Sequence, residues 1–122
     1  MELIKCSIDN CNLKNNGLVA TIGQFDGIHI AHQILIEKVC ELSEEKDLKS
    51  AVITFDPHPD LVLKKDANAT SIMTLDEKAA LIASMGIDYL IVVEFNQNVA
   101  NMTDSEFVNQ FLIKLNVKEI VV

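Results

Sequence analysis

The sequence contains no tryptophan and a single tyrosine, and aromatic residues make up only 5% of it. Because apolar residues still account for 49% of the chain, a core built from it is mainly aliphatic. No apolar run approaches the roughly 20 residues that a membrane-spanning helix needs. The N-terminus also lacks the basic and apolar regions of a secretory signal peptide. These absences predict a cytoplasmic globular protein without a membrane segment.

Basic residues are few, since 10 lysines and arginines stand against 18 aspartates and glutamates, for a net charge of −8. Such an acidic surface repels a phosphate backbone, which argues against binding of nucleic acid through a broad basic face. ATP meets the same repulsion unless positive potential is concentrated locally. A nucleotide-binding hypothesis for this chain therefore needs a local anion site and a divalent cation that accompanies the nucleotide.

Cysteine is scarce and odd in number, with Cys6, Cys11 and Cys40 as the whole set. Their spacing matches no structural zinc pattern, and no third ligand stands at a useful distance along the chain from the histidine pair His29 and His32. We therefore expect no metal held by the protein itself. Cys6 and Cys11 are close enough in sequence to pair, but free thiols are the expected state in a reducing compartment.

The central feature of the chain is a strand, a glycine-punctuated loop and a helix start. The apolar run Leu18–Ile22 is typical of a strand that is buried on both faces. Gly23 and Gly27 follow, where the backbone can turn sharply or approach a ligand closely. From Ile30 to about Lys46 the pattern becomes helical, with acidic residues on the solvated side. The residues expected on the buried side of this helix are Ile34, Leu35, Val39 and Leu42.

His29 and His32 stand where this loop becomes the helix. The N-terminus of a helix presents unpaired backbone N–H groups and about half a positive charge, so it favours anions. Histidines at a helix start are more often capping or surface residues than ligands, and Asp26 fits a capping role too. With the Gly23–Gly27 loop directly before them, however, we interpret the two histidines as part of the phosphate-binding corner of a nucleotide site.

The remaining chain alternates between strand and helix patterns. Met1–Ile8 is expected to form a short edge strand, and Ala51–Phe55 a buried one. The segment Asp56–Pro59 follows, and its two prolines present His58 on a stiff loop. Further strands are expected at Tyr89–Val93 and 118–122.

Two capping boxes open the later helices, one at Thr74–Glu77 and one at Thr103–Glu106. The first helix is expected to end at Gly86 and to carry Leu81, Ile82 and Met85 inward. Between the helices, 95–102 is expected to be a loop. The second helix is expected to bury Phe107, Val108, Phe111, Leu112 and Leu115.

Alternating helices and continuously apolar strands predict an α/β fold, a doubly wound parallel sheet covered by helices on both faces. Ligands of such sheets bind beyond the carboxyl ends of the strands, where the strand order reverses. The segments 23–32 and 56–59 each follow a strand, so we expect them at this edge.

The segment Gly23–Gln33 resembles the GxFDGxHxGHQ signature of the adenylyltransferase module of bacterial FAD synthetases, the bifunctional riboflavin kinase/FMN adenylyltransferases. Val52–Pro59 is similar to the TFxPHP segment of that family, and Met73–Lys78 to its helix-opening LTxxEK. Gly86–Leu90 and Val117–Val122 are similar to strands that follow. The resemblance extends from Leu18 onward, in order and with matching spacing.

The resemblance implies a Rossmann-like fold of the nucleotidyltransferase superfamily. It also implies the reaction ATP + FMN → FAD + pyrophosphate, with Mg2+ accompanying ATP. His29 and His32 are then the catalytic residues, as electrostatic stabilisers of the ATP phosphates. Other residues are implied to shape the adenylate pocket (Gly23, Phe25, Asp26 and Gly27) or to lie toward the flavin (Thr54, Pro57 and His58).

Two departures from the family pattern stand out. Ala31 occupies the place of the family's glycine between the two histidines. The family also continues beyond the fourth buried strand with a flavin loop, an arginine-bearing phosphate motif and a riboflavin kinase domain. We therefore expect residues 1–122 to be a single, C-terminally truncated adenylyltransferase domain, a poor or inactive catalyst alone. Its open sheet edge is expected to be covered by a second copy or a partner chain.

Two alternatives remain open at the level of sequence. One is a related nucleotidyltransferase that acts on pantetheine phosphate or a cytidylyl substrate, although the TFxPHP-like segment speaks against it. The other is a module that binds nucleotide or flavin without catalysis, or that serves as an interaction subunit.

Overall fold

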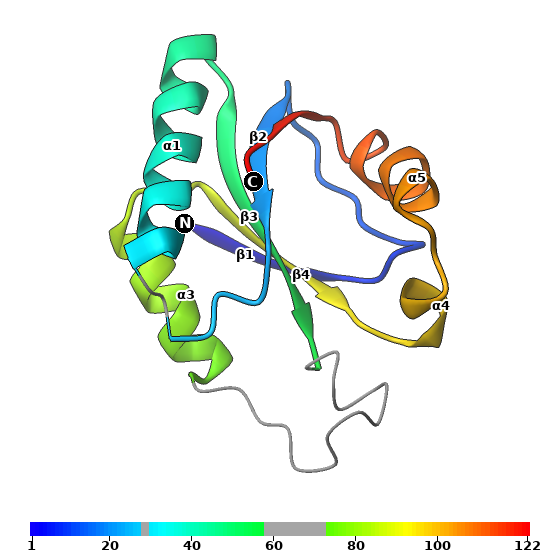
Figure 1. Cartoon of the computed structure of the whole chain (residues 1–122). Helices are drawn as coiled ribbons and strands as arrows, with labels where there is room; N and C mark the ends of the chain where they lie inside the picture. The colour runs from blue at the N-terminus through cyan, green and yellow to red at the C-terminus, as the bar shows by residue number, and fades with distance from the viewer. Residues whose placement is uncertain (28–29, 58–72) are drawn as a thin grey trace.

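The computed structural model describes residues 1–27, 30–57 and 73–122, and its strands form one parallel sheet (Figure 1). The sheet has five strands in the order β1-β4-β3-β2-β5. These are β1 (Glu2–Cys6), β2 (Leu18–Ile22), β3 (Lys49–Asp56), β4 (Tyr89–Glu94) and β5 (Val117–Ile120). The predicted parallel α/β fold is confirmed, including the edge strand at the N-terminus.

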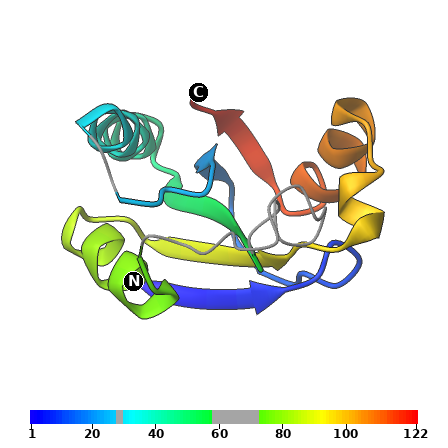
Figure 2. The ribbon, with the colours of Figure 1, turned by 60° about the horizontal axis from the view of Figure 1, so that its bottom comes forward.

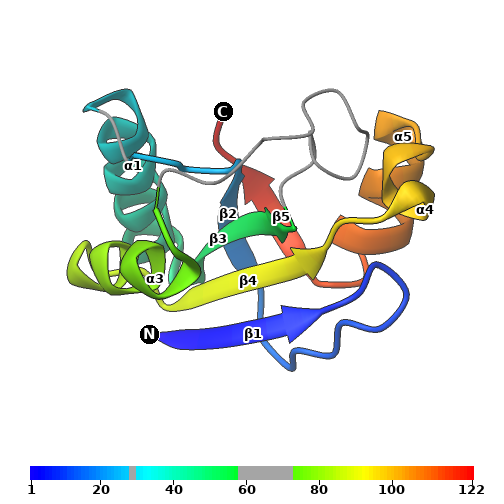
Figure 3. The same ribbon diagram turned by 90° about the horizontal axis from the view of Figure 1, so that it is seen from below.

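Helices cover both faces of the sheet, as Figure 3 shows. On one side lie α1 (Ile30–Lys46) and α3 (Leu75–Ser84), and on the other lie the short helices α4 (Gln97–Ala100) and α5 (Asp104–Phe107). A π-helical turn, η1 (Val108–Leu112), continues α5. Figure 2 shows the twisted sheet between these two groups. Among the helices of the described residues, none combines the length and apolar character needed to cross a membrane.

The sheet separates two cores, because alternate residues of a strand point to opposite faces. The core under α1 and α3 contains strand residues Val19, Val52, Leu90 and Val92 with helix residues Ile36, Val39 and Ile82. The core on the other face contains Leu18, Ala20, Ala51, Ile53, Ile91 and Val93 with Phe111, Leu112 and Leu115. Burial on both faces explains why the central strands read as continuous apolar runs.

Both predicted capping boxes are confirmed. The Thr74 hydroxyl accepts a hydrogen bond from the backbone N–H of Glu77 at 3.1 Å, and the Thr74 N–H donates to the Glu77 carboxylate at 3.3 Å. The same reciprocal pair joins Thr103 and Glu106. Helix α3 ends at Ser84 with Met85 as its C-cap, and Gly86, the expected stop, follows with a left-handed φ of +91°.

The expected buried faces of the helices are partly wrong. Ile34 is 60% exposed on α1, where the buried positions are Ile36, Val39 and Ser43. Leu81 is 39% exposed on α3. A helix that packs on one face of a sheet buries only one stripe of its surface, so apolar residues beside that stripe remain exposed to solvent.

The last helical segment also differs from its predicted pattern. The segment 95–102, expected to be a loop, contains α4, which Asn96 caps by accepting a hydrogen bond from the Val99 N–H at 3.1 Å. Val108 was expected to be buried but is 43% exposed. It opens the π-helical turn, whose wider spacing shifts the buried stripe to Phe111 and Leu112.

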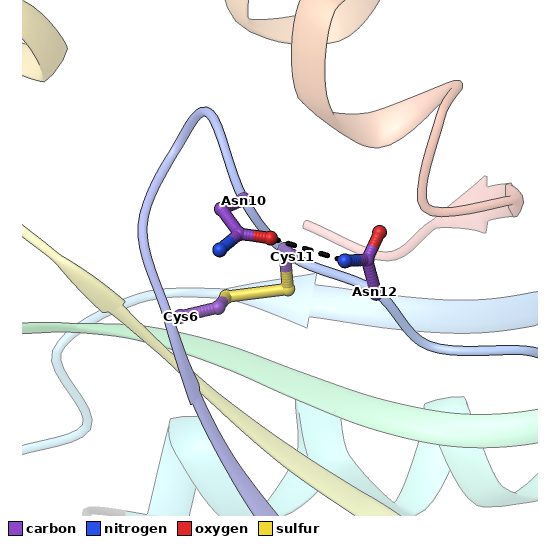
Figure 4. The surroundings of a disulfide bond; sticks show 4 residues. All are labelled: Cys6, Asn10, Cys11 and Asn12. Carbon is purple, nitrogen blue, oxygen red and sulfur yellow. Dashed lines mark hydrogen bonds between the residues drawn. A yellow bond between two sulfur atoms is a disulfide. The ribbon is translucent and has the colours of Figure 1, made fainter.

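Cys6 and Cys11 form a disulfide, so the expectation of three free thiols is wrong for this pair (Figure 4). Ser7 and Asn10 form a tight turn through two backbone hydrogen bonds of 3.3 and 3.1 Å. The turn brings the Cα atoms of the two cysteines to 5.0 Å, within the range of ordinary disulfides. Cys40 on α1 is a free thiol.

Alkylation of the thiols should report this arrangement. Burial raises the pKa of the Cys40 thiol, and the nearby carboxylates of Asp88, Glu44 and Glu37 raise it further. Because the thiolate is the nucleophile, a raised pKa lowers its fraction at any pH below that pKa. Iodoacetamide should therefore modify the native chain slowly at neutral pH, with a rate profile displaced to higher pH than that of a cysteine peptide.

The unfolded chain provides the control for this measurement by mass spectrometry. Without a reductant it should gain one alkyl group, and after reduction three, since the chain has three cysteines and one of them is free. Three groups gained without any reductant would contradict the disulfide.

Candidate functional site

The strand order reverses next to β2, so the carboxyl end of β2 is the expected place for a ligand. From β2 the chain moves outward through β3 to β4, and then returns to place β5 on the opposite side of β2. In an open parallel sheet, ligands bind at such a reversal, beyond the carboxyl ends of the strands. The loop 23–27 leaves β2 at this point and leads to α1.

Two residues of this loop have left-handed backbone. Gly27 has a φ of +73°, and Phe25 has a φ of +54°. For a residue with a bulky side chain this conformation costs about 1–2 kcal/mol, and such strain is concentrated at functional sites. Phe25 is nonetheless buried, with 3% exposure, and its ring lies 3.0 Å from the point where a Cβ at Gly23 would stand. A side chain at Gly23 would therefore press on the buried ring of Phe25.

Gln24 ties this loop to the end of β3. Its side-chain Oε1 accepts a hydrogen bond from the Phe55 N–H at 3.2 Å, and its backbone oxygen accepts one from the Thr54 hydroxyl at 3.5 Å. The Gly23 N–H donates to the backbone oxygen of Ile53 at 3.0 Å. The structure thus brings the segments after β2 and β3 together.

A buried lysine on α3 contacts the loop. Lys78 on α3 is 4% exposed, and its Nζ lies 3.3 Å from the Asp26 carboxylate and 2.6 Å from the backbone oxygen of Gln24. The sequence interpretation missed this residue, although its place at the end of the LTxxEK-like segment was a signal. Lys78 also occupies an inward position of α3, where an apolar residue is the ordinary choice.

The predicted site residues are placed as follows. His32 lies in the first turn of α1 and packs edge-on against Phe25, with ring centroids 5.1 Å apart. Thr54 is buried beside the loop, and Pro57 follows β3 directly. His29 and His58 lie outside the described residues, so the arrangement of the two histidines remains a prediction.

An apolar pocket of about 480 Å³ opens on the other face of the sheet. Residues at the carboxyl ends of β2, β3 and β5 line it, namely Ile22, Phe55 and Ile120, and Phe95 after β4 joins them. The Phe55 ring lies 5.6 Å from that of Phe95 and 6.1 Å from that of Phe107, measured between centroids. The sequence interpretation missed this pocket because its phenylalanines are distant in sequence and read as core or loop residues.

The carboxyl edge of the sheet therefore has two sides of opposite character. On the side of α1 and α3, a strained polar loop leads into a helix N-terminus and is joined to a buried ammonium group. On the side of α4 and α5, aromatic and aliphatic side chains form a pocket wide enough for a planar ring system. Such a site suits two ligands, one strongly anionic and one with a large apolar ring.

Comparison with known proteins gives consistent results. A family model described as FAD synthetase matches residues 11–122. The bifunctional riboflavin kinase/FMN adenylyltransferase of Bacillus subtilis is 39% identical over 104 residues, which cover 84% of this chain and 33% of the relative. An FAD synthetase of Listeria monocytogenes is 37% identical over 112 residues, which cover 91% of this chain and 45% of the relative. The chain thus spans less than half the length of these curated relatives.

A solved structure titled as a macrolide-efflux protein from Streptococcus pneumoniae has the same fold. It superposes with a TM-score of 0.86 over 99% of this chain and 47% of its own, at 24% sequence identity. At this identity the likeness concerns the fold alone.

Proposed function

This chain belongs to the FAD synthetase family, and we propose from this that it carries a site at which the adenylyl group of ATP is transferred to FMN, giving FAD and pyrophosphate. The proposal is carried by one observation. The polar loop 23–27 and the aromatic pocket lie on the two sides of the same strand ends, so a nucleotide and a flavin are able to meet over β2 and β3.

The chemistry needs alignment more than acid–base catalysis. The phosphate of FMN has a second pKa of about 6, so it is an anionic nucleophile at neutral pH without a general base. Its oxygen forms the new bond to the α-phosphorus of ATP, while the bond from that phosphorus to the β-phosphate oxygen breaks and pyrophosphate leaves. The protein has to hold both anions in line and stabilise the charge that develops on the leaving group.

The described residues suit these tasks. We assign the adenylate and phosphates to the loop Gly23–Gly27 and to the start of α1, with His32 and His29 as electrostatic stabilisers. Mg2+ enters as part of the ATP complex. Its charge offsets the acidity of a chain with a net charge of −8.

We assign the isoalloxazine ring of FMN to the aromatic pocket, where it is able to stack on phenylalanine. By resemblance to the family, Pro57 and His58 are also assigned to the flavin. The resemblance implies that Thr54 also lies toward the flavin, but its hydroxyl donates to the backbone oxygen of Gln24, so we assign Thr54 to the loop side instead.

Calorimetric titration of the chain with ATP–Mg2+ and, separately, with FMN tests the function. Binding of both ligands at micromolar to millimolar concentrations, followed by slow FAD formation when they are mixed, is the expected result, since we expect the chain to be a poor catalyst alone. Absence of binding of either ligand would overturn the proposal. Binding of ATP with preference for pantetheine phosphate over FMN would assign the chain to the other transferase type.

Substitution of Phe107 by alanine should weaken FMN binding about tenfold, an amount equal to about 1.4 kcal/mol, because one wall of the ring pocket is lost. ATP affinity should stay within about twofold, since Phe107 lies on the opposite face of the sheet from the loop. The matched control is Ile113→Ala on the next turn, where the side chain is 60% exposed and lines no part of the pocket. Equal loss of both ligands in Phe107→Ala would place the flavin elsewhere.

A further inference from the structure

Lys78 is a charged side chain in a place that usually holds an apolar one. It is 4% exposed, and the other buried position of α3, one turn later, is occupied by Ile82. A buried ammonium is costly unless it is paired and hydrogen-bonded. Its two partners among the described residues, the Asp26 carboxylate at 3.3 Å and the Gln24 backbone oxygen at 2.6 Å, belong to the loop between Gly23 and Gly27.

We propose that Lys78 is the positioning residue of the nucleotide half of the site, a role that rests on the function proposed above. In this role its ammonium group does not touch ATP. It fixes the loop that touches ATP, because it binds this loop from α3 at two residues, Gln24 and Asp26.

The contacts form a continuous chain from Lys78 to His32. Lys78 donates a hydrogen bond to the backbone oxygen of Gln24. Gln24 is also hydrogen-bonded to Phe55 and Thr54 of β3. The next residue, Phe25, is held in its left-handed conformation between the two anchored residues Gln24 and Asp26. Its ring packs edge-on against the imidazole of His32 at 5.1 Å. The position of His32 therefore depends on a loop conformation that Lys78 stabilises.

The alternative is that Lys78 contributes to folding alone. A pair of buried opposite charges is often no better for stability than two well-packed apolar groups, because both charges lose their hydration. An aliphatic residue at this position would satisfy the core of α3 but would leave Asp26 and Gln24 without this anchor. The presence of an ion pair that joins Lys78 to the loop therefore favours the positioning role.

Three variants separate positioning from stability. Lys78→Met keeps the aliphatic stem and removes the ammonium group. The double variant Lys78→Met/Asp26→Asn removes both charges of this ion pair. Lys78→Arg keeps the positive charge, although its planar group fits the site differently. The matched control is Lys38→Met on α1, where the lysine side chain is 55% exposed.

The measurements are the dissociation constants for ATP–Mg2+ and FMN, the melting temperature, and the imidazole NMR signals of His32. Lys78→Met and the double variant should each lose at least tenfold in ATP affinity and keep FMN affinity within twofold. Their His32 signals should shift, because the ring current of Phe25 moves with the loop. Lys78→Arg should recover part of the ATP affinity, and Lys38→Met should match the parent chain.

The outcomes distinguish a positioning role of Lys78 from a contribution to folding only. Folded Lys78 variants that keep the parental ATP affinity and unshifted His32 signals would overturn the positioning role. The role would also be overturned if the variants lost ATP affinity and FMN affinity equally and in step with their melting temperature. A parent chain that binds neither ATP nor FMN would overturn the proposed function, and this inference with it. A parent chain that binds both, with unaffected Lys78 variants, would overturn this inference alone.

Discussion

Replacement of His32 by alanine is expected to lower the rate of FAD formation at least about 100-fold, the usual effect of removing one preorganised donor from developing charge. His32 lies in the first turn of α1, where the helix N-terminus favours anions, and its ring is held by Phe25. The imidazole is therefore already in place when the phosphates arrive, and this lowers the barrier without further reorganisation. Single-turnover conversion of FMN to FAD, with the chain in excess over FMN, measures the effect.

The control for this substitution is Glu41→Ala, which changes a residue of the same helix that is 73% exposed and lies away from its N-terminus. It should leave the rate within about twofold, because surface changes away from a site have small effects. FMN affinity should be unchanged in both variants, since the aromatic pocket lies on the other face of the sheet. A His32→Ala chain that forms FAD at the parental rate would remove His32 from the site.

Replacement of Leu90 by alanine is expected to cost about 3–5 kcal/mol of unfolding free energy, the usual range for a leucine removed from a rigid core. Leu90 has no exposed surface and stands on β4 between β1 and β3, in the core under α1 and α3. The surrounding strands and helices cannot close a cavity there without loss of their own contacts. Since small domains have about 5–15 kcal/mol of stability in total, the variant should be partly unfolded at 37 °C.

Leu3→Ala is the matched control for Leu90→Ala. Leu3 is the direct register partner of Leu90 on the edge strand β1, and it is 36% exposed. The same chemical change should cost only about 1 kcal/mol there, because less apolar surface leaves a buried environment. Urea unfolding followed by circular dichroism measures both values. Equal costs at the two positions would show that the sheet centre is no more tightly packed than its edge.

The two sides of the site have a common origin in the sheet. Because successive residues of a strand point to opposite faces, Thr54 is directed to the glycine loop and Phe55, the next residue, to the aromatic pocket. One pair of neighbouring residues on β3 thus contributes to both proposed ligand sites. Coverage of the sheet edge by a second copy or another chain stays a prediction.

The sequence by itself determined the features that depend on local physics. The apolar runs predicted four of the five strands as buried or partly buried, and the alternation with helices predicted the parallel sheet, because only covered parallel strands are apolar throughout. The capping boxes at Thr74 and Thr103 were predictable because capping is decided within one helical turn. The motif Gly23–Gln33 indicated the family together with the segments Val52–Pro59 and Met73–Lys78, because all three occur in the family's order and spacing.

Only the tertiary structure decided the features that depend on residues distant in sequence. It placed β5 beside β2 and selected Ile36 over Ile34 for the core. It also gathered the phenylalanines of the pocket from separate segments. The anchor between Lys78 and Asp26 joins residues 52 positions apart by their numbers, in two different elements. No local sequence pattern predicts such contacts, because packing against the sheet decides which side chains of each helix are buried.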